Sequence, residues 1–575
     1  MPGSGGVAHR TPDDLRTSRL PLAPLLALSL AAVWMILAPR TPDLAAQVYR
    51  VDLFDHMGFA VWDARWYAGH DLPGYSLLVG PLASLVGLRV LALLSAVASA
   101  VLFERLALRF YGVSARWGAV WFALAAVGDV WIGRVTFALG VPFALAAVLA
   151  LAARRPLLAA LLAALSAAAS PVAGVLLGLA ALTRALTPMS SGLSLSYRGG
   201  AGSRPSGRNA RAVLLLAVPA AAVVVPLALL FPEGGHEPFP VVSFAVTAIV
   251  SVAFLVSLPR HQPLLRNGAI VFLLVSLLCL VIPSPVGSNV ERYAVLLAGP
   301  LLLCARTGAG GKGGSPPVRG LPARGLPASG VAIVLCLIAV WVTWGPVRET
   351  LAVSGEESTR SSYYVPVERF LESRADGPVR IEVPLTRSHW EAALLAPSVS
   401  LARGWEKQLE ERFDRVLLDP GLTAAAYWRW LHEEAVAYVA LPDATLDPSS
   451  AQEGRLIRSG PAYLTEVFSN AHWRIFAVRS PTPIATGPGR LVSLGHDSFV
   501  LRAGSAGSFL VRVRFTRYFT VTRGSACVSR ARGGWTTVRT LAAGDVKVVA
   551  RFSLARALGV SGACVRASPR AHPPY

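Results

Sequence analysis

The chain has 575 residues, of which 54% are hydrophobic and only 15% are charged. A soluble protein carries about 25% charged residues, so this composition excludes an ordinary soluble globular chain. The formal net charge of +21 suggests nucleic acid as a partner, but the arginines lie largely in short segments between apolar blocks. Arginines in that position set membrane topology, and we therefore exclude nucleic acid binding.

Apolar blocks of about 15–25 residues predict membrane-spanning helices. In chain order these blocks cover residues 20–39, 86–103, 117–132, 135–153, 157–185, 212–231, 240–258, 268–283, 292–305 and 330–345. The block at 157–185 is too long for one straight span, and Ser170-Pro171 interrupts it, where proline disfavours continuous helix. Because arginines flank both of its ends, we interpret it as a hairpin of two short helices, which gives about eleven helices.

With this hairpin, the arginine-rich loops all fall on one side of the membrane. The N-terminus and the loops that contain Arg105, Arg260 and Arg306 are then inside, as the positive-inside rule requires. The Gly- and Pro-rich stretch 307–329 is expected to be a flexible cytoplasmic linker. We therefore predict a multi-pass protein of the plasma (inner) membrane, with a cytoplasmic N-terminus and an extracytoplasmic C-terminal part.

The composition changes at about Val347, where charges return and long apolar blocks end. Residues 347–482 mix helical stretches with short strands and predict an α/β domain, and residues 483–575 alternate as β-strands do between Gly-rich turns. The predicted fold is thus mainly α, a polytopic helix bundle over 1–346 followed by an extracytoplasmic α/β domain and a β-sandwich-like domain. Cys527 and Cys564 lie outside the apolar blocks, and a disulfide between them is expected there.

The first outer loop holds the densest group of polar and aromatic residues. Asp52 and Asp55 are three positions apart and share a face if the segment is helical. A carboxylate at a membrane interface can act as a general base, so these two acids are the predicted catalytic residues. Predicted substrate-binding residues follow them in the loop: Asp63, Trp66, Tyr67 and His70. The alternative is an aromatic belt on a solvated loop.

Other outer segments carry further candidates for substrate binding. Arg134 follows a span and has Asp129 as an alternative, purely structural partner. Glu233, His236 and Glu237 form a local group that either binds a divalent metal or makes a turn, and no other cofactor is indicated.

Two later segments complete the set. Glu291 and Arg292 begin a span, where Arg292 either binds a lipid phosphate or extends toward the interface. Arg387, Arg403 and Trp405 lie in polar-aromatic runs of the C-terminal part. These runs either cap a cleft above the membrane or begin helices.

Several motifs together indicate a family. A group of actinobacterial integral membrane proteins has motifs that these resemble: Trp62-Asp63 with Trp66-Tyr67-Ala68-Gly69-His70, Leu72-Pro73-Gly74-Tyr75-Ser76, Ser170-Pro171, Phe231-Pro232-Glu233-Gly234-Gly235 and Leu401-Ala402-Arg403-Gly404-Trp405. That group is of the polytopic GT-C glycosyltransferase type. The resemblance extends over roughly residues 20–480, and the usual close Asp-x-Asp or Asp-Glu pair of GT-C enzymes is absent from it.

The resemblance implies transfer of a sugar from a polyprenyl-phosphate donor to an extracytoplasmic cell-envelope glycan or lipid acceptor. Asp52 matches the position of the base that deprotonates the acceptor hydroxyl, with Asp55 and Asp63 as alternatives, and Arg292 would lie near the donor phosphate. The expected partners are this donor, membrane lipid and the acceptor. Two other functions stay open: a transporter or flippase of a lipid-linked glycan, and a non-catalytic protein of envelope assembly.

The topology can be tested with a reporter enzyme fused after residue 350. Because the arginine-rich loops share one side only if Ser170-Pro171 is a turn, a periplasmic-type alkaline phosphatase should be active at this position. A cytoplasmic reporter at the same position should be inactive. The reverse pattern would contradict the predicted orientation.

Overall fold

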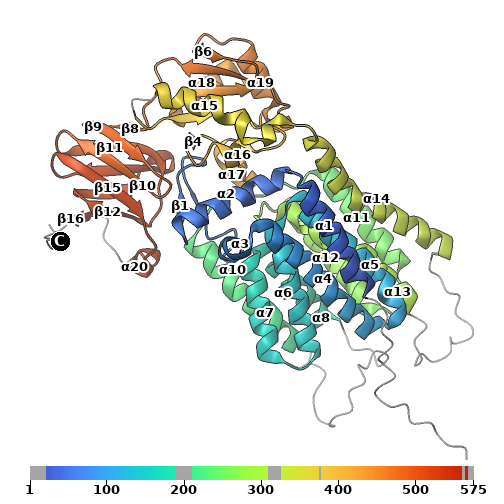
Figure 1. Cartoon of the computed structure of the whole chain (residues 1–575). Coiled ribbons are helices and arrows are strands. Elements are labelled where there is room, and N and C mark those ends of the chain that lie inside the picture. Colours follow the sequence, from blue (N-terminus) through green and yellow to red (C-terminus); the bar gives the residue numbers. More distant parts are fainter. Residues whose placement is uncertain (1–20, 188–209, 309–325, 375–376, 560–563, 567–575) are drawn as a thin grey trace, which may run out of the picture.

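The structure, a computed structural model, describes residues 21–187, 210–308, 326–374, 377–559 and 564–566. It is mainly helical, with a strand-rich C-terminal region (Figure 1). The helices form one elongated bundle, and two smaller units sit at one end of it, one made of helices and strands and one made of strands. Most of the predicted linker 307–329 lies outside the described residues, as do the arginines before residue 20 and those at 198–208.

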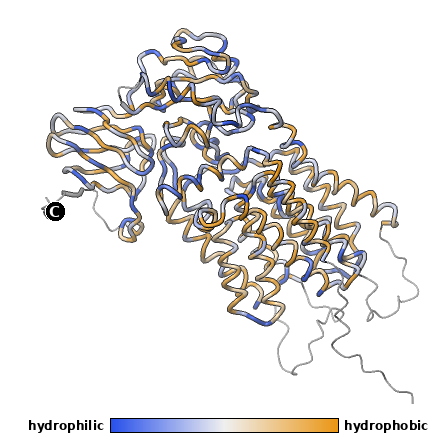
Figure 2. The backbone as a smooth tube through the Cα atoms, viewed as in Figure 1, coloured by the Kyte–Doolittle hydropathy of each residue, from blue (hydrophilic) through white to orange (hydrophobic). Residues whose placement is uncertain are grey.

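Each predicted apolar block forms helix in the structure. The bundle consists of α1 (Leu22–Leu37), α4 (Leu88–Tyr111), α5 (Arg116–Ile132), α6 (Val135–Ala152), α7 (Pro156–Ala169), α8 (Pro171–Leu186), a π-helical turn (Val213–Ala217) that continues into α10 (Val218–Leu230), α11 (Val241–Ser257), α12 (Pro263–Val281), α13 (Glu291–Thr307) and α14 (Ala328–Val353). Hydrophobic residues dominate these helices, whereas the C-terminal units mix both kinds (Figure 2).

Fewer helices than the predicted eleven qualify as membrane spans by their own length and composition. Within the described residues, five do: α4, α6, the helix over 210–230, α12 and α14. A sixth span results if α1 and the helix after it count together. The difference arises because α5, α7, α8, α11 and α13 have only 14 to 17 residues. The chain is therefore a membrane protein on this criterion, and its orientation stays a prediction.

The predicted break at Ser170-Pro171 is present, and it reverses the chain. A side chain at Gly174 would come within 2.7 Å of Ala167 Cβ, which shows that α8 folds back along α7. The Ser170 side chain accepts a hydrogen bond from the Ala173 backbone N–H and caps α8. Leu77 N–H donates to the Ala168 carbonyl, so this turn lies at the same end of the bundle as the first loop.

The first loop contains two short helices that lie at this end. Helix α2 (Pro42–Met57) is bent by 80° from α1, after Ala38 ends α1 in a left-handed conformation. Helix α3 (Val79–Val86) packs on α2, since a side chain at Gly80 would collide with Phe54. Between them, β1 (Trp62–Asp63) and β2 (His70–Asp71) form a small antiparallel hairpin.

The unit after α14 contains one mixed sheet. Its order is β4-β3-β5-β7-β6, formed by β3 (Arg380–Glu382), β4 (Ser400–Leu401), β5 (Val436–Pro442), β6 (Leu464–Ser469) and β7 (Trp473–Val478). Strands β3, β4 and β5 are parallel and the others antiparallel. The accompanying helices are α15 (Ser361–Arg374), α16 (Glu391–Leu394), α17 (Lys407–Phe413), α18 (Ala424–Glu433) and α19 (Ala451–Arg458).

Two further sheets form the β-rich unit, and they share one apolar core. Their orders are β12-β15-β10-β9 and β16-β13-β14-β11-β8. The strands are β8 (Ala485–Thr486), β9 (Gly489–Leu494), β10 (Ser498–Ala503), β11 (Gly507–Arg514), β12 (Phe519–Arg523), β13 (Ser525–Arg530), β14 (Trp535–Thr540), β15 (Gly544–Ala550) and β16 (Cys564–Arg566). Phe499 of β10 and Phe509 of β11, one from each sheet, are fully buried in this core. A short helix, α20 (Leu554–Ala557), follows β15.

Cys527 is disulfide-bonded, and its backbone pairs with that of Cys564 in the adjacent strand β16. The predicted disulfide partner is thus its cross-strand neighbour. Replacing Cys527 by Ser should destabilise the β-rich unit, because loss of a native disulfide typically costs about 2–5 kcal/mol. Thermal unfolding of the detergent-solubilised chain measures this effect. The control is Cys336→Ser, which removes a free, exposed cysteine; equal melting temperatures for the two variants would contradict the prediction.

Candidate functional site

One face of α2 presents three polar side chains in series. Asp43, Gln47 and Arg50 are four and three positions apart, so they lie above one another on the helix. Asp52 lies on the opposite face, about half a turn away at 3.6 residues per turn. The turn before α6 fixes this orientation of α2, because a side chain at Gly133 would come within 2.4 Å of the Leu44 backbone. Only glycine permits this close approach.

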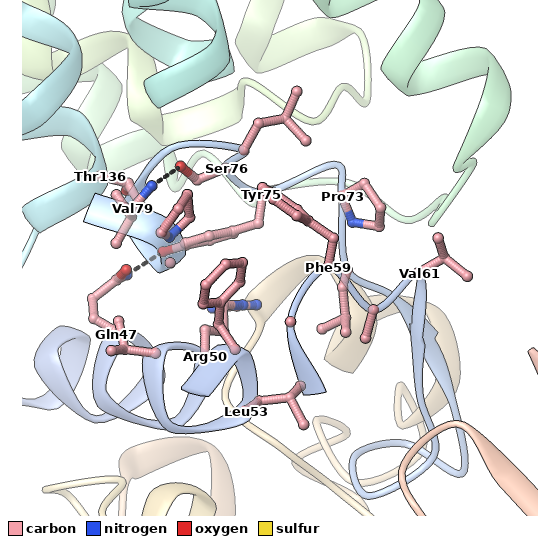
Figure 3. A pocket seen from close by; sticks show the side chains of 18 residues that line it. Gln47, Arg50, Leu53, Phe59, Val61, Pro73, Tyr75, Ser76, Val79 and Thr136 are labelled. Atoms are coloured by element: carbon pink, nitrogen blue, oxygen red, sulfur yellow. Dashed lines mark hydrogen bonds between the residues drawn. The ribbon is translucent and has the colours of Figure 1, made fainter. Parts of the chain in front are cut away.

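A pocket of about 110 Å³ opens beside the Gln47 and Arg50 side of α2 (Figure 3). Its wall is mostly apolar and comes from α2, the segments 58–61 and 72–77, and the start of α3. Gln47 donates a hydrogen bond to the Tyr75 hydroxyl across the pocket. The Arg50 guanidinium lies 3.6 Å from the centre of the Tyr75 ring. The pocket therefore combines an apolar wall with one cationic end.

Arg50 is only partly neutralised. Its Nη2 donates to Glu406 Oε2 at 2.6 Å, whereas its Nε and Nη1 are buried without a hydrogen-bond partner. Glu406 in turn is hydrogen-bonded to Glu233. Burial, followed by the charge of Glu406, raises the pKa of Glu233 well above its ordinary value, because two adjacent carboxylates in a buried site favour sharing a proton. Two donor nitrogens of Arg50 thus lack an acceptor in this structure.

Asp43 belongs to a second polar group that adjoins the first. Arg134 Nε lies 3.4 Å from Asp43 Oδ2, and its Nη1 lies 3.6 Å from Asp129 Oδ1. The Asp43 side chain remains 35% exposed, so the ion pair leaves part of this carboxylate accessible. Arg292 lies over the Phe137 ring and has a buried Nε without a hydrogen-bond partner. Its charge acts on Asp43, Asp129 and Tyr75, which connects this group to the pocket.

The loop at 232–239 closes the site from another side, but its three candidate metal ligands diverge. Glu233 faces Glu406, whereas Glu237 accepts a hydrogen bond from Ser288 at 2.9 Å. His236 Nε2 lies 4.0 Å from Glu411. Among the residues that the structure describes, no group of three or more His, Cys, Asp or Glu side chains comes together to hold a metal. Glu291, the remaining candidate here, accepts from Thr247 at 3.0 Å.

Asp63 is a fully buried junction between three parts of the chain. It accepts a hydrogen bond from the Tyr49 hydroxyl of α2 at 2.7 Å, and His496 Nδ1 of the β-rich unit lies 3.0 Å from its other oxygen. Burial alone would raise the pKa of Asp63, but the hydrogen bond from His496 and the charge of His70 outweigh burial and lower it. Asp63 is therefore held as a carboxylate in a structural position.

The aromatic candidates of the first loop are packing residues in this structure. Trp66 and Tyr67 are fully buried, and Trp66 stacks on Tyr49 with a centroid separation of 4.4 Å. His70 is buried against Trp66. A side chain at Gly404 would collide with Trp66, which shows how closely the α/β unit covers this loop. Of the loop's aromatic residues, Tyr75 is one that lines the pocket.

The candidates in the α/β unit occupy three different environments. Arg387 is exposed. Arg403 is buried among carboxylates, with Glu382 at 3.0 Å and Glu453 at 3.1 Å, and it holds this unit together. The Trp405 ring stacks on His389 at 3.4 Å and precedes Glu406, so it stands close to the partner of Arg50.

The structure does not bring Asp52 or Asp55 into the pocket. The half-exposed Asp52 lies 3.6 Å from His56, and the exposed Asp55 accepts a hydrogen bond from Ser84 of α3. Arg134 forms ion pairs with its expected partner Asp129 and with a carboxylate that the sequence analysis missed, Asp43. The available signal was the Asp43, Gln47, Arg50 spacing on one face of a helix that directly follows a span.

No known family model matches the sequence of this chain, and no curated protein matches it either. The function therefore has to be argued from the residues and their geometry.

Asp71 gives a test of the electrostatics around the site. Burial raises its pKa to about 7, against the lowering effect of Arg517 and Arg412, and its Oδ1 has no hydrogen-bond partner. Because the folded-state pKa exceeds the unfolded value of 3.8, the folded state binds the proton more tightly. The resulting stability is complete below about pH 4 and is lost as the pH rises through about 7.

Replacement of Asp71 by Asn should therefore remove this pH dependence. It should raise the free energy of unfolding at about pH 8 by no more than about 4 kcal/mol, and change it little at about pH 4. Thermal unfolding at both pH values measures the difference, with Asp55→Asn at an exposed position as the control. If Asp71→Asn and the native chain lose stability equally between the two pH values, the interpretation of Asp71 fails.

Proposed function

We propose that this chain is a membrane glycosyltransferase that transfers a sugar from a polyprenyl-phosphate donor to an extracytoplasmic cell-envelope glycan or lipid. The observation that carries the proposal is the polar face of α2. It aligns a partly exposed carboxylate, Asp43, with Arg50, whose guanidinium has two unpaired donors at the end of an apolar pocket. A base and an anion-binding group on one helix face, two turns or about 10 Å apart, are the two elements that such a transfer requires.

The pocket suits the phosphate end of a lipid-linked donor. Guanidinium N–H groups match phosphate oxygens in geometry and charge. Arg50 lies over the Tyr75 ring in the pocket, and Arg292, over Phe137, has a further unpaired Nε. Phe59, which lines the pocket, is 70% exposed, and Leu85 of the neighbouring α3 is 80% exposed. This apolar surface beside the pocket offers a path for a polyprenyl chain from the bilayer.

Asp43 is the proposed general base. The acceptor hydroxyl oxygen attacks the anomeric carbon of the sugar, and the bond between that carbon and the phosphate oxygen breaks. The hydroxyl proton passes to the Asp43 carboxylate, and the polyprenyl phosphate leaves with the bonding electron pair, its added charge stabilised by Arg50 and Arg292. Attack opposite the leaving group inverts the anomeric configuration. Asp52 and Asp55 remain the alternative base pair indicated by sequence position.

The transporter alternative receives less support from the helix bundle. Several buried polar side chains of the spans are Ser and Thr hydroxyls that donate to a carbonyl of the preceding turn, as Ser95, Thr183 and Ser251 do. Such hydroxyls have their hydrogen bonds satisfied within their own helix, and they do not by themselves form a path for a polar head group. The polar groups of the site instead gather at one end of the bundle, which favours chemistry at a membrane surface.

The assignment of the base is testable with two matched variants. Asp43→Asn and Asp52→Asn each replace a carboxylate by an amide on the same helix, but only Asp43 lies on the Gln47 and Arg50 face. Asp43→Asn should reduce transfer by about 100- to 10,000-fold, because an amide cannot accept the proton, whereas Asp52→Asn should retain activity. Each gene is expressed in a deletion strain, and the envelope glycans and the amount of inserted protein are measured.

The possible results separate the readings. If only Asp52→Asn abolishes the glycan, the general base is Asp52, on the opposite face of α2, and not Asp43. Full restoration by Asp43→Asn, Asp52→Asn and Asp55→Asn alike would contradict catalysis by this helix and favour the transporter or assembly function. An Arg50→Gln variant adds a check of the donor site, since it should weaken use of the donor while the protein remains inserted.

A further inference from the structure

The β-rich unit carries an exposed apolar group at one edge. Phe552, Leu554 and Leu558, in and around α20, are 50%, 62% and 68% exposed. Large apolar side chains clustered on a folded surface mark an interaction site. In Figure 1, α20 lies at the lower edge of this unit, toward the level of the helix bundle.

Contacts to α10 place this edge beside a membrane helix. The Tyr518 hydroxyl donates to the Leu230 carbonyl at 2.8 Å, at the last residue of α10. The Phe552 ring lies 6.0 Å from that of Phe231, the next residue in the chain after α10. The helix over 210–230 has a mean hydropathy of 2.8, and its Leu229 side chain is 68% exposed. The apolar group therefore continues the lipid-facing surface of α10 beyond its end.

Two exposed arginines lie at this edge, and Asp71 is near one of them, Arg517. Arg551 is exposed next to Phe552, and Arg517 is exposed while it donates to the Ala557 carbonyl of α20. Arg556, in contrast, is directed inward and donates to Phe519 and Thr520 of β12, which fixes α20 on the sheet. A rigid apolar tip with exposed arginines beside it matches the boundary between acyl chains and phosphate head groups.

We propose that the edge formed by residues 551–558 inserts into the outer part of the lipid leaflet that surrounds α10. Phe552, Leu554 and Leu558 lie among the first acyl carbons, and Arg517 and Arg551 contact lipid phosphates. This anchor holds the β-rich unit against the membrane, so that His496 stays at Asp63 of the first loop. The inference requires only that α10 is embedded in lipid, and it is independent of the glycosyl transfer proposed above.

Depth-dependent fluorescence quenching tests the anchor. The full chain, with Cys279, Cys304 and Cys336 replaced by Ser and the disulfide of Cys527 retained, receives a single cysteine at Leu554 that is labelled with the fluorophore NBD. The matched control is Val492→Cys, an exposed apolar position on β9. Strand β9 forms the edge of its sheet opposite to β12, on which α20 is fixed. Both proteins are reconstituted in phosphatidylcholine vesicles that contain lipid with a nitroxide at carbon 5 of the acyl chain.

The label at 554 should lose most of its emission in vesicles with the nitroxide lipid, and the label at 492 should lose little. An emission maximum at shorter wavelength for 554 should accompany the quenching, because the fluorophore leaves water. Equal and weak quenching at both positions would overturn the proposal, because it would mean that this edge does not enter the lipid. The exposed apolar group would then be a surface for another protein. Unchanged thermal unfolding of both labelled chains establishes that they are folded.

Discussion

The arrangement of the site depends on the burial of one carboxylate, Asp63. Its two oxygens engage Tyr49 of α2 and His496 of the β-rich unit, which are more than 400 residues apart in the sequence. A buried charge that loses a partner costs about 3–5 kcal/mol, so the first loop and the β-rich unit are held together as long as this carboxylate stays satisfied. Tyr49 precedes Arg50, and thus the same contact also sets the rotation of α2 that directs Arg50 into the pocket.

Two buried arginines differ in how many carboxylates surround them. Arg403 is surrounded by the carboxylates of Glu382, Glu410 and Glu453 in the interior of the α/β unit. Its charge is balanced there, although its Nη1 also has no hydrogen-bond partner. Arg50 has one ion pair and two N–H groups that nothing in its surroundings accepts. An unsatisfied buried donor costs about 1–3 kcal/mol. The cation–π contact with the Tyr75 ring, 3.6 Å from the guanidinium, offsets part of this cost.

The sequence indicates the elements of this chain better than it indicates its site. Apolar length and the Ser170-Pro171 break are local features, and each predicted block is a helix in the structure. The direction in which Asp52 points is not determined by nearby sequence, because residues 42–57 carry apolar and polar side chains on both faces. The close approach of Gly133 to Leu44 helps to set which face points to the pocket. The burial of Trp66 likewise depends on Gly404, more than 300 positions away, so no pattern within the loop reveals it.

Helices of unequal length meet beside the site. Helix α7 has 14 residues and spans about 21 Å at 1.5 Å per residue, against about 30 Å for a typical hydrocarbon core. Helix α10 packs on α7 and α8, and the turn between these two helices contacts the first loop at Leu77. The helix over 210–230 has 21 residues, about 32 Å at the same rise, so α7 does not by itself set the thickness of the apolar layer at this end of the bundle. The end of the bundle that carries the first loop is therefore built from helices of unequal length.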